Sequence, residues 1–319
     1  MRDRAFTRAM TPIVMAKTRS VSNIRAKARP APINLQRPAG VESFAPDDAR
    51  EGWRAGVRAV EMGDNVITIF EDIGYDWWTG GGVTAKGIAA QLRAIGPRPI
   101  EVQINSPGGD MFEGLAIYNL LRDHPQPITV KVLGIAASAA SIIAMAGDEI
   151  LIGAASFLMI HNCWVMAAGN RHDLRKVADT LEPFDAACAG LYASRSKQSD
   201  ADCAGWLDAE TYMNGALAIE RGFADALLPA DAITEDTAAT AKASALNEVR
   251  AVERMLVSGG MTRSQARAHI AAIKGVDINQ LRGMPDAAPE PGTPGAAEHD
   301  GWDAAAFAAA TGLLATLRA

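Results

Sequence analysis

From Asn65 to His161 the chain alternates apolar, strand-like runs with helical segments, and this alternation limits the fold more than any other feature. The runs VITIFED, IEVQIN, ITVKVLG, EILIG and SFLMI have the short length and β-branched content of buried strands. Helical patterns separate the first four of them: TAKGIAAQLRAI, FEGLAIYNLLRDH and SAASIIAMAG. This order predicts crossover units and a largely parallel sheet, and therefore an α/β fold.

The flanks differ from this central part, so the chain is predicted to have three parts. Residues 1–63 are basic and proline-containing, and we expect a largely disordered arm with one short helix within Asp48–Glu61. Residues 64–229 form the predicted compact domain, which includes a long helix at Arg171–Ser196. Residues 230–319 are predicted to contain a linker, an amphipathic helical pair at 246–274 and an Ala/Pro-rich tail.

Composition excludes several classes of function. A net charge of −6 gives no reason to expect a nucleic-acid partner. Three widely spaced cysteines suggest neither a disulfide framework nor a zinc site, and no apolar run reaches the roughly 18 residues of a membrane span. The motif GxxxxGK[ST] is absent, so the chain itself is not expected to hydrolyse ATP. We expect a cytoplasmic protein without metal or cofactor.

Ser138 is the first candidate for chemistry, because it lies where the run ITVKVLG gives way to a helix. Its neighbours are alanines, so nothing crowds the hydroxyl, and amides at the first turn of a helix favour developing negative charge. The simpler interpretation is a helix N-cap, which needs no partner histidine. The GxSxG motif of ordinary α/β-hydrolases is absent.

Two further segments supply what a nucleophilic serine requires. Ser106-Pro107-Gly108-Gly109 follows a strand, and its glycines leave backbone amides uncovered, as an oxyanion hole needs; a simple turn is the alternative. His161 ends another strand and could act as base, although a lone histidine is often structural. His161 and Cys163 could form part of a metal site, but the sequence shows no further ligands for it.

A carboxylate would complete a catalytic triad by orienting the imidazole. The segment LDAETYMNG offers Asp208 and Glu210, at the end of a predicted helix. Asp173, Asp179 and Asp185 lie on the long predicted helix, where we expect them on a solvated face.

Taken in order, INSPGG, GIAASAAS, MIH and AETYMNGALAIERGFAD resemble the proteolytic subunit of the Clp protease. WWTGGGVTAKGIAAQL, EGLAIYNLL and AGNRHDL resemble, more narrowly, the Clp-like head-maturation (prohead) proteases of tailed phages and prophages. The resemblance covers about residues 65–229. It implies the Clp-protease/crotonase-like fold of stacked ββα crossover units.

The resemblance also implies residue roles. By position Ser138 is the nucleophile, His161 the general base, and the amides of Gly109 and Ala139 the oxyanion hole, with Ser106, Pro107 and Gly108 in the loop that receives the substrate strand. The family's acid is an aspartate, whereas this chain has Glu210 in that slot, and Asp208 is the alternative.

The implied partners are protein substrates and further copies of the chain. The family forms ring-shaped homo-oligomers, in which the helix at 171–196 would lie between two rings. The phage branch implies cleavage of scaffold, capsid or portal proteins, in the cytoplasm of a bacterial host or inside assembling proheads. Two alternatives stay open: a housekeeping Clp-type peptidase with an ATP-dependent unfoldase, and a non-catalytic oligomeric assembly factor.

Overall fold

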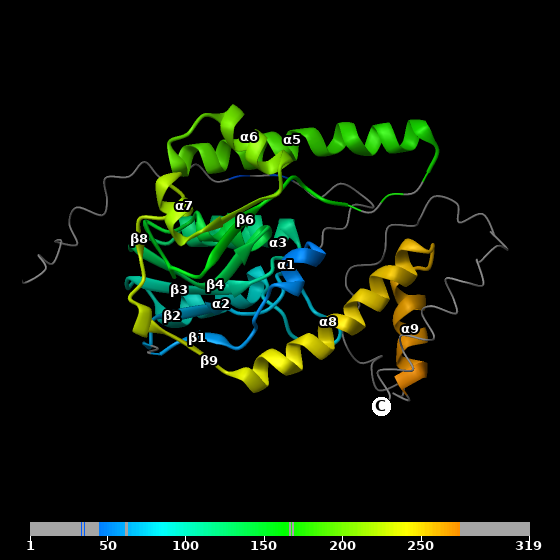
Figure 1. The fold of residues 1–319 in the computed structure, drawn as a ribbon, viewed down its shortest axis with the longest axis horizontal. Helices are drawn as coiled ribbons and strands as arrows, with labels where there is room; N and C mark the ends of the chain where they lie inside the picture. Colours follow the sequence, from blue (N-terminus) through cyan, green and yellow to red (C-terminus); the bar gives the residue numbers. More distant parts are fainter. Residues whose placement is uncertain are drawn as a thin grey trace, which may run out of the picture.

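The computed structural model describes residues 45–60, 63–165, 167 and 169–274, together with Ile33 and Leu35 (Figure 1). Most of the predicted disordered arm and the predicted Ala/Pro-rich tail therefore lie outside the described residues. The three-part division of the chain stays a prediction.

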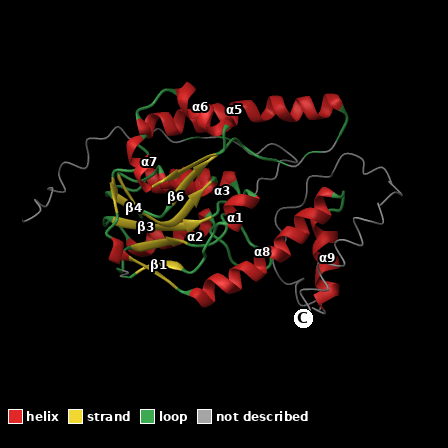
Figure 2. Cartoon of the chain, in the orientation of Figure 1, coloured by secondary structure: helices red, strands yellow, loops and turns green. Residues whose placement is uncertain are grey.

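Short strands and mostly short helices alternate through the described chain, as Figure 2 shows. The strands are β1 (Val57–Ala59), β2 (Val66–Ile69), β3 (Ile100–Ser106), β4 (Ile128–Ala137), β5 (Glu149–Ile152), β6 (Phe157–Ile160), β7 (Thr211–Asn214), β8 (Ala226–Leu227) and β9 (Ile233–Glu235). The helices are α1 (Asp47–Glu51), α2 (Ala85–Ile95), α3 (Met111–Arg122), α4 (Ala139–Ala144), α5 (Arg171–Ser196), α6 (Asp200–Asp208), α7 (Gly215–Glu220), α8 (Thr237–Ser258) and α9 (Arg263–Lys274).

The main sheet is parallel except at one edge. Its order is β2-β3-β4-β5-β8, and β6 pairs with both β4 and β7, the β6–β7 pair being antiparallel. The two halves of β4 have different neighbours, because Thr129–Val132 pairs with β5 and Ile135–Ala137 pairs with β6. This change of partner places the carboxyl ends of β4 and β6 side by side, and the Ser138 turn follows directly.

The core of this body is built by the apolar faces that the sequence pattern predicts. Ile104, Val130, Val132 and Ile152 on the strands are fully buried, and they form one cluster with Tyr118 of α3. In β3 and in the first half of β4 apolar residues alternate with polar ones, so the apolar residues of each strand share one face of the sheet.

Helix α5 is longer than the surface that it covers. It begins with a capping box in which Asn170 and Asp173 exchange hydrogen bonds, and it ends at Lys197 in the left-handed conformation. Buried residues occur only in its second half, from Phe184 onward. Figure 1 shows the first half extending past the body, toward the side of α8 and α9.

Part of the N-terminal segment is packed on the body. Trp53 is buried and donates from its indole nitrogen to the carbonyl of Asn105 at 3.0 Å. β1 pairs antiparallel with β9, so residues 57–59 lie beside residues 233–235. The helix expected around Asp48–Glu61 is shorter than predicted, because α1 ends at Glu51 and residues 57–59 form the strand β1 instead.

The C-terminal helical pair is present as α8 and α9, separated by Gly259, Gly260 and a following turn. α8 begins at Thr237, before the predicted start at residue 246, because Asp236 caps it through the amides of Ala238 and Ala239. The two helices share an apolar cluster that also contacts Trp78. None of the described helices is long and apolar enough to cross a membrane.

Candidate active site

Ser138 is the single residue between β4 and α4, and its backbone is strained. Its φ of 52° and ψ of −124° lie outside the regions that residues with a Cβ normally adopt. Its amide donates to the carbonyl of Met159 on β6 at 2.9 Å, which fixes the turn against the neighbouring strand. The hydroxyl makes no capping bond to α4, so Ser138 is not the simple N-cap serine.

The hydroxyl of Ser138 instead meets the imidazole of His161. Ala137 and Met159 are paired across β4 and β6, so the residues that follow these strands lie at the same edge of the sheet. The Ser138 Oγ and the His161 Nε2 are 2.7 Å apart, a normal hydrogen-bond distance. Adjacent parallel strands thus bring together two residues that are separated by 23 positions in the sequence.

Burial determines the charge state of His161. It lowers the pKa of the imidazole below 6.5, although the carboxylates of Asp48 and Asp185 act in the opposite direction. The imidazole is therefore neutral near pH 7, and Nε2 can accept the hydroxyl hydrogen of Ser138. This is the protonation state that a general base needs.

The loop after β3 lies directly against the serine. Gly108 has φ of 98°, and a Cβ there would come within 2.7 Å of both the Ala137 carbonyl oxygen and the Ser138 Cβ. Gly109 has φ of 146°, and its Cβ would meet the Ile73 oxygen at 2.2 Å. Both positions therefore require glycine. Pro107, which precedes them, is buried.

The Ser106 side chain stabilises this loop through two hydrogen bonds. Its hydroxyl donates to the carbonyl of Glu71 at 2.6 Å and accepts from the amide of Gly108 at 3.2 Å. On the other side of Ser138, Ala139 is the first residue of α4, so its amide has no acceptor within that helix. The structure thus places the glycine loop and the first turn of α4 against Ser138, and the oxyanion-hole role of Gly109 and Ala139 stays a prediction.

Neither predicted acid contacts the imidazole among the described contacts. Glu210 follows α6, is exposed and has φ of 45°. Asp208 is also exposed, and its Oδ1 accepts from the side-chain amide of Asn162 at 2.7 Å. Asp208 therefore contacts the residue after His161 but not the imidazole itself.

Two other carboxylates influence His161. Asp185 of α5 accepts from the amide of Cys163 at 2.6 Å, and Asp48 of α1 accepts from the hydroxyl of Tyr212 at 2.7 Å. Their charges favour the protonated imidazole. Asp185 is half-buried rather than on a solvated face, a position that its spacing of three residues from buried Cys188 could have indicated. Nothing in the local sequence points to Asp48.

Ser138, His161 and a glycine loop at one edge of a mixed, mostly parallel sheet define a Clp protease-like α/β fold, as predicted from the sequence. Residues 83–231 match the family model described as Clp protease. No group of three His, Cys, Asp or Glu side chains within the described residues could bind a metal ion.

Relatives of this segment carry the same family description. The ATP-dependent Clp protease proteolytic subunit of Deinococcus radiodurans is 36% identical over 110 residues, which cover 30% of this chain and 54% of the relative. The protein with that description from Pleurastrum terricola is 31% identical over 126 residues, covering 39% and 64%. The chain thus spans between about half and two thirds of these relatives. A solved structure, a point mutant of ClpP1 from Listeria monocytogenes, has 19% identity and a TM-score of 0.43, and the match covers 56% of this chain and 95% of the other.

Proposed function

We propose that this chain is a serine endopeptidase of the Clp type. The observation that carries the proposal is the 2.7 Å hydrogen bond between the Ser138 hydroxyl and the Nε2 of the half-buried His161. The strained backbone of Ser138 supports it, because such strain persists mainly at functional sites. The similarity of residues 83–231 to the family model described as Clp protease agrees with this activity.

The proposed reaction is acyl transfer in two steps. His161 Nε2 takes the proton as the Ser138 oxygen attacks the peptide carbonyl, and the amides of Gly109 and Ala139 receive the negative charge that develops on the carbonyl oxygen. His161 then gives its proton to the departing amine. Water, activated by the same imidazole, attacks the acyl-enzyme and releases Ser138.

The acid of this mechanism is an open choice between four carboxylates. Glu210 occupies the family's position, and Asp208 contacts Asn162 beside the base. Asp48 and Asp185 supply the charge that opposes the lowered pKa of His161, so they stabilise the imidazolium formed in the first step.

The physiological role that we propose is maturation of phage or prophage heads, by cleavage of scaffold, capsid or portal proteins. The phage-type motifs around the glycine loop support this role, and so does the helical pair α8–α9, which lies beyond the family match. The chain would act as a homo-oligomeric ring, with the projecting half of α5 contacting another copy.

A housekeeping Clp-type peptidase is the second candidate, because both relatives are described as subunits of an ATP-dependent Clp protease. It would require an unfoldase, and a stable complex with a hexameric ATPase would favour it. In a third candidate, a non-catalytic assembly factor, the fold would serve oligomerisation alone.

Co-expression with the capsid genes encoded beside it tests these candidates. Wild type and Ser138→Ala are compared, and the capsid proteins are analysed by mass spectrometry. Maturation predicts capsid or scaffold fragments with wild type only. Identical fragment patterns would contradict proteolysis, and normal heads with Ser138→Ala would favour the assembly factor.

A further inference from the structure

A cavity of about 140 Å³ lies between the loop at residues 72–78, helix α1 and the pair α8–α9. This volume holds several waters or one acidic side chain, since a water molecule occupies about 30 Å³ in the liquid. Charged side chains dominate its lining, with one more arginine than carboxylates: Arg50, Arg250, Arg254, Arg263 and Arg267 against Asp72, Asp76, Asp110 and Glu253. Three aromatic side chains, Tyr75, Trp77 and Trp78, complete the wall.

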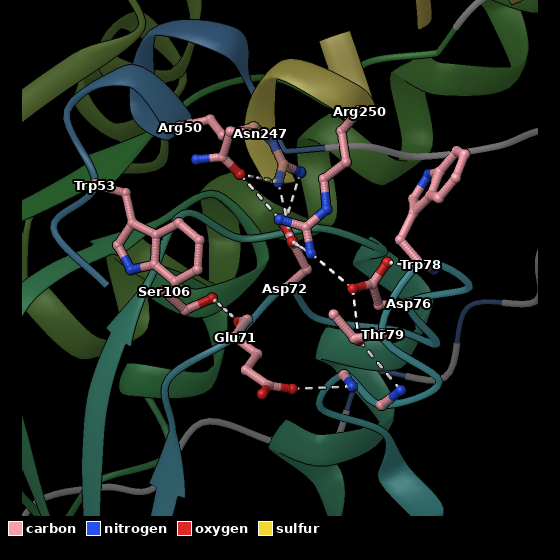
Figure 3. Close-up of polar contacts among 12 residues, drawn as sticks. Arg50, Trp53, Glu71, Asp72, Asp76, Trp78, Thr79, Ser106, Asn247 and Arg250 are labelled. Atoms are coloured by element: carbon pink, nitrogen blue, oxygen red, sulfur yellow. Dashed lines mark hydrogen bonds and ion pairs between the residues drawn. The ribbon is translucent and has the colours of Figure 1, made fainter. Parts of the chain in front are cut away.

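Two of the arginines are fixed by the aspartates (Figure 3). The Asp72 carboxylate accepts a hydrogen bond from Arg50 at 2.9 Å and forms an ion pair with Arg250 at 2.9 Å. Arg250 forms a second ion pair, with Asp76, at 2.7 Å. Asn247 accepts a further bond from Arg250 at 2.9 Å. These contacts make this side of the cavity rigid.

Other lining groups are also neutralised. Glu253 accepts from the Arg267 Nε at 2.8 Å and from the Trp78 indole. Asp110 directs its carboxylate to the first amides of α3, with a bond of 2.8 Å to Phe112. Its negative charge therefore stabilises the N-terminus of α3.

The charge of Arg254 is only partly compensated. Its ion pair is with Asp47, whose side chain is 69% exposed, so solvent screens that interaction. The Nε atoms of Arg254 and Arg50 are buried and have no acceptor among the described residues. Burial lowers the pKa of Arg254, and the neighbouring charge of Arg50 lowers it further. An additional carboxylate would relieve this excess of positive charge.

The cavity adjoins the candidate active site through the glycine loop. Gly108 lies against Ser138, and Gly109, the next residue, lines the cavity. Ile73 forms a parallel bridge with Gly109 and lines it as well. The glycine loop therefore connects the surroundings of Ser138 with the lining of the cavity.

We propose that this cavity is a specificity subsite that accepts a carboxylate of the peptide substrate. The proposal rests on the proposed endopeptidase activity and names the substrate class, peptides with an acidic residue near the scissile bond. Guanidinium groups bind carboxylates through two parallel hydrogen bonds, whereas a lysine or arginine side chain would be repelled.

The test measures how peptides slow the labelling of Ser138 by a fluorophosphonate in the full-length protein. One set of peptides carries Glu at successive positions, and a matched set carries Gln. A third set has an amidated carboxyl terminus, which separates an acidic side chain from a terminal carboxylate. We expect one Glu position to strengthen competition by about tenfold or more over Gln. Equal competition by Glu and Gln peptides at every position would overturn the proposal.

Arg254→Gln should remove this preference for Glu over Gln peptides. Arg93→Gln, which removes an exposed arginine of α2, is the control and should keep it. A preference for Glu peptides that persists in Arg254→Gln also contradicts the proposal. If this variant does not fold, the ratio of Glu to Gln competition in the wild-type protein tests the proposal. If wild-type Ser138 is not labelled at all, the endopeptidase proposal fails, a result distinct from labelling without acid preference.

Discussion

The strained turn at Ser138 predicts that glycine is the more stable substitution for this serine. Ser138→Ala and Ser138→Gly both remove the hydroxyl and its bond to His161, so they differ only in the Cβ. At φ of 52° and ψ of −124° a Cβ costs about 1–3 kcal/mol, whereas glycine adopts positive φ readily. The greater freedom of glycine in the unfolded chain offsets about 0.4–1 kcal/mol of this gain.

The net expectation is that Ser138→Gly is more stable than Ser138→Ala by about 1 kcal/mol, or about 2–4 °C in Tm for a body of this size. Urea unfolding of the two variants, followed by circular dichroism, measures the difference. Ala140→Gly, inside α4, is the control and should destabilise by about 1 kcal/mol, because its backbone is helical. If Ser138→Gly is no more stable than Ser138→Ala, the turn is not strained and the reasoning fails.

Three further predictions concern the base, the glycine loop and the cavity. Because burial lowers the pKa of His161, the rate at which Ser138 is labelled should fall only below pH 6.5. Asp185→Asn should move this acidic limb of the pH–rate profile to lower pH. An unmoved limb would show that Asp185 does not act on the base. Gly108→Ala should abolish labelling, whereas alanine at Gly96, which has positive φ but open space around it, should spare it. Arg250→Met should lower the free energy of unfolding by about 3–5 kcal/mol, because it leaves two aspartates buried without this partner; denaturant titration checks this, and a change below about 1 kcal/mol would contradict it.

The local pattern of the sequence predicts those elements whose residues carry the signal themselves. The long helix expected at Arg171–Ser196 has these bounds in the structure, because residues at its own two ends determine the N-terminal cap and the left-handed C-terminal residue. The sequence pattern does not predict β1 or β9, because strands of three residues are too short to show a periodicity. It does not predict β7 either, because these four residues form a strand only through their pairing with β6.

Some residues of the candidate site can likewise be predicted from the sequence, whereas others cannot. Ser138 and His161 could be paired from sequence, because parallel strands bring their carboxyl ends to one edge. The carboxylates Asp48 and Asp185 could not be placed near the base, since one comes from α1 and the other from α5. The arginine-lined cavity also depends on distant segments, because α8 brings Arg250 onto the loop at residues 72–78.

The most direct test of the proposed nucleophile is mass spectrometry of the full-length protein after reaction with a fluorophosphonate. A single adduct on Ser138, lost in Ser138→Ala and strongly slowed in His161→Ala, is the expected result, because a serine hydroxyl is reactive only beside its base. No adduct, or an adduct on Ser138 that forms equally fast without His161, would contradict the proposed mechanism.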